Sequence, residues 1–179
     1  MRLWNPATGH PVGKTLHATS AQYLVTWLAF SPNGKLLASA DGDGTVRLWN
    51  PLTSRAIGAP LHAGTGPNAG VLAVAFSPNG KLLASADADG TVQLWNPATR
   101  RAVGAPIPAD TSPNGGVTGV AFSPNGKLLA SASADGTVQL WEVSLFARPY
   151  ATLCLDAGPP TRQDWGKYAA GEPQPKICA

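Results

Sequence analysis

Aspartate followed by glycine is the residue pair in this sequence with the clearest capacity for chemistry. The pairs Asp43-Gly44, Asp89-Gly90 and Asp135-Gly136 each carry a carboxylate that could act as a general acid or base. The three pairs are spaced 46 residues apart, however, and a catalytic group is not expected in every copy of a repeat. The recurrence favours a role in turns, where an aspartate side chain bonds the backbone next to it. No Ser, His and Asp arrangement differs from this repeated pattern, so the sequence predicts no catalytic nucleophile.

Two other candidates, a phosphate-binding loop and a histidine metal site, lack the spacing that their chemistry needs. Gly13-Lys14-Thr15 is similar to the end of a phosphate-binding loop, but that loop needs a glycine five residues earlier, where this chain has Thr8. His10, His17 and His62 do not have the spacing of metal ligands, and no cysteine or glutamate lies near them in the sequence. We therefore expect no metal, no cofactor, no small-molecule substrate and no enzymatic activity.

The elements that must position these residues belong to an internal repeat. The segment Phe-Ser-Pro-Asn-Gly-Lys-Leu-Leu-Ala-Ser-Ala begins at Phe30, Phe76 and Phe122. Each copy contains an apolar run, a Ser-Pro-Asn-Gly turn, a second apolar run and an Asp-Gly hairpin, which together predict antiparallel strands. In the middle copy the four predicted strands are 71–76, 81–86, 91–95 and 101–107. A four-stranded meander in each unit is one blade of a β-propeller, so we expect an all-β fold.

The repeat resembles the WD40 family, whose closing Trp-Asp appears here as Trp-Asn or Trp-Glu. The resemblance implies a propeller that serves as a protein-interaction scaffold, without catalysis of its own. It also implies a structural hydrogen-bond network in the blades, made of His, Ser, Asp and Trp. In the third copy Pro108 stands where the family has its histidine. The residues of this sequence at the network positions are Ser39, Asp43, Trp49, Ser85, Asp89, Trp95, Ser131, Asp135, Trp141, His17 and His62.

The strands of the repeats predict about three and a half blades. We expect a half blade at 1–16 with only the third and fourth strands, blades at 17–61 and 62–107, and a last blade at 108–155 with an uncertain outer strand. Closed propellers use about four to eight blades, so this array has an unfinished end. Three alternatives remain open. The N-terminal strands dock onto the last blade, two or more chains share a larger ring, or the sequence is a piece of a longer protein.

The C-terminal residues 156–179 are expected to form a tail with a short helix that begins near Thr161. The tail is similar to the segment that closes the WD40 array in large bacterial signalling proteins. That resemblance implies, as an alternative function, a detached regulatory module of an ATPase or a protease-type protein. Cys154 and Cys178 are expected to be reduced thiols in a cytoplasmic protein rather than a disulfide.

Charged residues separate between the two sets of strand connections. The connections after the first and third strands carry lysine and arginine, and the other connections carry aspartate, which predicts a basic rim and an acidic rim. We therefore expect a basic protein or peptide segment to bind near Asp41, Asp87 and Asp110. The net charge is +3, but the sequence has no block of lysine and arginine, so the chain is not expected to bind nucleic acid. It also has no run of 18 apolar residues, so no membrane span is predicted. A propeller enzyme is the least favoured alternative.

Overall fold

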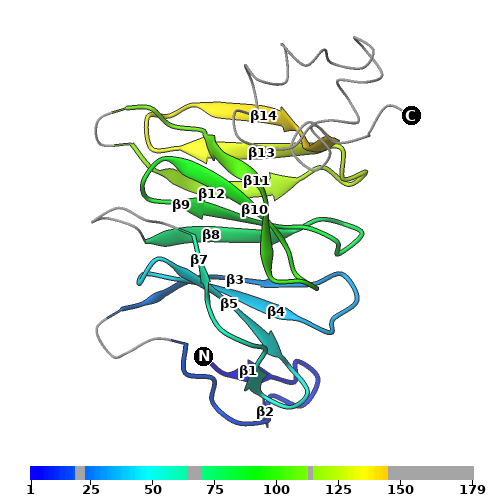
Figure 1. Cartoon of the computed structure of the whole chain (residues 1–179). Coiled ribbons are helices and arrows are strands. Elements are labelled where there is room, and N and C mark those ends of the chain that lie inside the picture. The colour runs from blue at the N-terminus through cyan, green and yellow to red at the C-terminus, as the bar shows by residue number, and fades with distance from the viewer. Residues whose placement is uncertain (19–22, 64–69, 113–114, 145–179) are drawn as a thin grey trace.

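The computed structural model describes residues 1–18, 23–63, 70–112 and 115–144, and the elements in them are 14 β-strands in four antiparallel sheets. Figure 1 shows the sheets stacked one above the next along the chain. We call them half-blade A, blade B, blade C and blade D. The strands of half-blade A and blade B are β1 (Leu3–Trp4), β2 (Pro11–Val12), β3 (Val25–Phe30), β4 (Leu37–Asp41), β5 (Thr45–Asn50), β6 (Arg55–Ala56) and β7 (Leu61–His62). Those of blades C and D are β8 (Val71–Phe76), β9 (Leu83–Asp87), β10 (Thr91–Asn96), β11 (Arg101–Pro108), β12 (Val117–Phe122), β13 (Leu128–Ser133) and β14 (Val138–Glu142).

Each blade is a meander, as the repeat predicts. In blade C the strands pair in the order β8-β9-β10-β11, and in blade B two short strands, β6 and β7, both pair with β5 in place of one outer strand. The outer strand of blade C is continuous, but its register against β10 shifts between Val92 and Leu94. Blade D is described only as far as its third strand. Its expected outer strand and the C-terminal helix both lie outside the described residues.

The Ser-Pro-Asn-Gly turns are held by their own side chains. In blade C the Ser77 hydroxyl accepts a hydrogen bond from the Leu82 N–H at 2.9 Å, and the Asn79 Oδ1 accepts one from the Lys81 N–H at 2.9 Å. Gly80 takes a positive φ of 68°, a conformation that residues with a Cβ rarely adopt. The same bonds recur in the turns that begin at Ser31 and Ser123. These turns fix the strand registers at one rim of the stack.

The apolar core lies between the sheets. Side chains alternate along a strand, so each inner strand presents one face to the preceding blade and one to the next. In β10, Trp95 packs in a cluster with Val46 of blade B, whereas Leu94 packs in a cluster with Leu129 of blade D. A third cluster joins Leu16 to blade B. Each blade is therefore stabilised by its neighbours, at roughly 1.5–3 kcal/mol for each buried Val or Leu.

Half-blade A packs against blade B, and it does not close the ring. Figure 1 shows half-blade A and blade D at opposite ends of the stack. The alternative in which the N-terminal strands dock onto the last blade is therefore not the arrangement in this structure. The physical reason is local, because the Met1 amino group and carbonyl both bond the backbone of Leu16, which lies in the cluster beside Leu37 and Trp49.

Candidate interaction surfaces

The Ser and Trp residues of the predicted network are bonded in all three copies. The indole N–H of Trp49 donates to the Ser39 hydroxyl at 3.1 Å, and Trp95 donates to Ser85 at the same distance. Trp141 donates to the Ser131 hydroxyl at 2.9 Å. The three serines are completely buried, so these bonds give their hydroxyls a partner in place of water. They hold the blade together and are not available to a partner.

The aspartates occupy the opposite places from those predicted. Asp41 and Asp87, expected at a partner surface, are 0% exposed, and their carboxylates accept bonds from the hydroxyls of Ser39 at 3.2 Å and Ser85 at 3.4 Å. This correction follows from strand alternation, because residues two apart on a strand point to the same side. Asp110 is also buried, at 8% exposure, so none of the three carboxylates of the predicted basic-partner site lies at the surface.

The aspartate of each Asp-Gly pair lies at the hairpin turn. Asp43, Asp89 and Asp135 each accept bonds from the backbone and hydroxyl of the threonine two residues later. Asp89 and Asp135 are exposed, and Asp43 is half-buried. The two histidines predicted for the network, His17 and His62, are exposed and lie outside these bonds.

The third predicted partner residue, Asp110, organises its own loop. It is 8% exposed, and its Oδ1 accepts bonds from the Ser112 hydroxyl at 2.6 Å and the Ser112 N–H at 2.9 Å. These bonds lower the pKa of Asp110. Its carbonyl also lies against Gly90, where a Cβ would clash, so this loop is fitted tightly to the hairpin of blade C.

The interior aspartate has a different environment in each copy. In blade B the Arg47 guanidinium lies 2.7 Å from Asp41. In blade C the corresponding residue is Gln93, which donates to the Leu94 carbonyl at 2.8 Å. Among the described residues no cation pairs with Asp87, so burial, together with the nearby Asp89, raises its pKa to about 7. In blade D a serine stands at this position.

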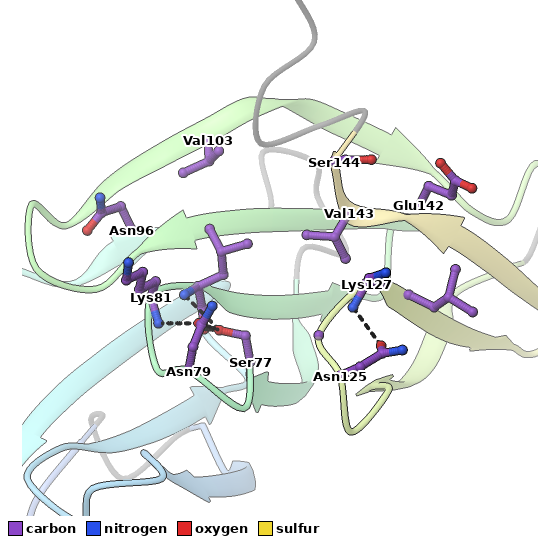
Figure 2. A pocket seen from close by; sticks show the side chains of 13 residues that line it. Ser77, Asn79, Lys81, Asn96, Val103, Asn125, Lys127, Glu142, Val143 and Ser144 are labelled. Atoms are coloured by element: carbon purple, nitrogen blue, oxygen red, sulfur yellow. Dashed lines mark hydrogen bonds between the residues drawn. The ribbon is translucent and has the colours of Figure 1, made fainter. Parts of the chain in front are cut away.

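A groove of about 990 Å³ opens between blades C and D at the rim of the Ser-Pro-Asn-Gly turns. We call it the turn groove. Figure 2 shows that the polar side chains come from both blades, with apolar side chains between them. The repeat predicts the lysines on this rim but not the groove, because the walls of the groove come from two different repeats. Its charged and amide-bearing lining residues are Asn79, Lys81, Asn96, Asn125, Lys127 and Glu142.

The two ends of the stack expose residues that are interior elsewhere. In blade D, Val138 is 68% exposed and Leu140 is 67% exposed, whereas the corresponding Val92 and Leu94 of blade C are 0% and 1% exposed. At the other end, Trp4 is 57% exposed, although Trp49 and Trp95 at the same repeat position are buried. Leu28 and Phe30 of β3 are also exposed at 45% and 56%. These are the blade faces that lack a neighbouring sheet.

The described residues contain no group of three or more His, Cys, Asp or Glu side chains placed to hold a metal ion. A search of the same residues finds no helix with the length and apolar character needed to span a membrane.

The comparisons with known proteins agree with the architecture. The family model "WD domain, G-beta repeat" matches residues 10–50, 58–96 and 108–142, which is more than half of the chain. No curated protein matches the sequence. WD40 repeats generally mediate protein interactions and are generally non-catalytic. With three matched repeats, each of which contributes antiparallel strands to a separate sheet, the chain belongs to the WD40 repeat family.

Proposed function

We propose that this chain is a non-catalytic protein-interaction scaffold whose blade array is continued by a second copy of the same chain. The observation that carries the proposal is the difference between blades C and D. Nearly identical sequences are buried in one and uncovered in the other, because only blade C has a blade on both sides. An apolar face of this kind on a folded protein marks an interaction surface.

The junctions within the chain indicate how the second copy would dock. Between blades B and C, Val46 and Leu48 of one blade share a cluster with Trp95 of the next. The uncovered residues Val138 and Leu140 correspond to the first pair, and Trp4 corresponds to the tryptophan. Head-to-tail docking would therefore place Trp4 of one copy against Val138 and Leu140 of the other. Two such contacts close a ring if the rotation between copies allows it.

The mass of the chain in solution tests this proposal. We expect light scattering to give twice the chain mass of 18.4 kDa. Leu140→Ser should shift the population to the single-chain mass, because it removes the apolar contact. Leu52→Ser is the matched control, since Leu52 is 86% exposed but lies in the turn that follows β5. A parent chain that stays at 18.4 kDa and melts cooperatively would contradict self-association.

The regulatory module of a larger signalling protein depends on residues 145–179, which lie outside the described residues. A cytoplasmic location, a preference for a basic partner and the propeller-enzyme alternative also stay predictions.

A further inference from the structure

The turn groove is lined by three asparagines whose side-chain oxygen atoms already accept hydrogen bonds. Asn79 Oδ1 accepts from the Ser77 hydroxyl and the Lys81 N–H, both at 2.9 Å. Asn125 Oδ1 makes the same two bonds in the next copy, and Asn96 Oδ1 accepts from the Ala98 and Thr99 N–H groups. Because backbone N–H groups can only donate, they fix the oxygen and leave each Nδ2 as a donor. The hydrogen bonds among the described residues include no acceptor for these three Nδ2 groups.

The charged side chains of the groove are also mostly hydrogen-bond donors. Lys81 and Lys127 both line it, and the ion pairs of the described residues involve neither of them. Among the lining residues that the structure describes, Glu142 is the only acidic one. Five of the six charged and amide-bearing side chains therefore offer donors, and three amide groups with two ammonium groups match a ligand that is rich in oxygen acceptors.

The remaining walls favour a peptide over a nucleic acid. The apolar lining residues are aliphatic, among them Leu82, Val103 and Val143. Single-stranded nucleic acids usually bind on aromatic side chains that stack with the bases, and none of the described lining residues is aromatic. A volume of about 990 Å³ is also at the upper end for a small-molecule pocket, which leaves room for several residues of an extended chain.

We infer that the turn groove binds an acidic peptide segment, whose carboxylates accept hydrogen bonds from the asparagine Nδ2 groups and pair with Lys81 and Lys127. This inference rests on the proposed function as an interaction scaffold and names the chemistry of one partner. It also places that partner on the rim opposite the acidic hairpin tips. Glu142, which pairs with Leu128 beside Lys127, would orient the segment, because it repels a carboxylate close to it.

The repeat supplies a matched pair of variants for the test. Asn79→Asp with Asn96→Asp keeps both Oδ1 acceptors but replaces two donors with carboxylate oxygens. Asn33→Asp with Asn50→Asp makes the same change in charge and turn chemistry one repeat earlier, at residues that do not line the groove. Fluorescence anisotropy with labelled hexaglutamate measures binding, and hexalysine and a thymidine hexanucleotide serve as further probes.

We expect hexaglutamate to bind the parent chain and to bind the Asn79/Asn96 variant at least about tenfold more weakly. The Asn33/Asn50 variant should bind it within about twofold of the parent, because its added charges are remote and screened by salt. Lys81→Ala removes a lysine of the groove, and Lys35→Ala removes the corresponding lysine one repeat earlier. This pair repeats the comparison of test and control without adding carboxylates. Equal losses in the two asparagine variants, unchanged affinity in both, or tighter binding of the hexanucleotide would overturn the inference.

The mass of each variant separates this inference from the proposed function. The turn groove does not include Val138, Leu140 or Trp4, so the Asn79/Asn96 variant should keep the two-copy mass. Loss of hexaglutamate binding at an unchanged mass is the expected result for that variant. If the parent chain associates but does not bind hexaglutamate, the inference of acidic-peptide binding is rejected and self-association is not. A single-chain mass with hexaglutamate bound rejects self-association alone.

Discussion

Blades C and D are a comparison that the protein itself provides. Residues 76–95 and 122–141 differ at a single position, Asp87 against Ser133. Yet the Val-x-Leu pair of the third strand is buried in blade C and more than half exposed in blade D. This difference in exposure shows that the neighbouring blade creates the burial, since an isolated blade has two apolar faces. An end blade is therefore an interaction surface unless something covers it.

The largest expected effect comes from the same truncation in the two blades. Leu94→Ala should lower the free energy of unfolding by about 2–5 kcal/mol, because it opens a cavity between blades C and D. Leu140→Ala should cost less than about 1 kcal/mol where the chain is a single copy, since Leu140 is 67% exposed there.

Urea unfolding at low protein concentration measures both variants. Equal losses would show that blade D is covered in solution even as a single copy, and the comparison between the blades would fail.

An effect of similar size is expected at the interior aspartate of blade C. The pKa of Asp87 is raised from 3.8 to about 7, so the folded state binds more protons than the unfolded state between these values. Stability should therefore fall as the pH rises from about 4 to about 7. Asp87→Asn removes the ionisation and should stabilise the chain by roughly 4 kcal/mol at about pH 8, with little gain near pH 4.

Thermal or urea unfolding across this pH range checks the sign. Blade B provides the control, because Arg47→Gln gives Asp41 the environment that Asp87 has and should introduce a similar loss of stability at high pH. A gain from Asp87→Asn that is the same at low and high pH would mean that ionisation of Asp87 is not its cause.

The sequence predicts the blades well because their signals are local. The Ser77 side chain bonds within its own turn, and the Asp89 side chain bonds the threonine two residues later, so the strands on either side follow from the repeat alone. The Ser-Trp bonds follow from the resemblance to the WD40 family, because these residues stand at the positions of the family's network.

The candidate surfaces are less predictable, for two physical reasons. The interior position of Asp41 could have been inferred, because it lies two residues after the buried Ser39 on one strand. The exposure of Leu140 could not, because Leu94 has the same local sequence and is buried. The turn groove could not have been inferred either, since Asn79 and Asn125 come from separate repeats and meet only when the blades stack.

Mixing two variants with opposite defects tests the head-to-tail continuation of the array most directly. Trp4→Ala damages only the N-terminal face and Leu140→Ser only the face of blade D, so each variant retains the surface that the other lacks. Each variant alone is expected to have the single-chain mass of 18.4 kDa, and an equal mixture should recover a two-chain species. A mixture that stays at the single-chain mass, or a Trp4→Ala chain that associates as well as the parent, would contradict the head-to-tail continuation.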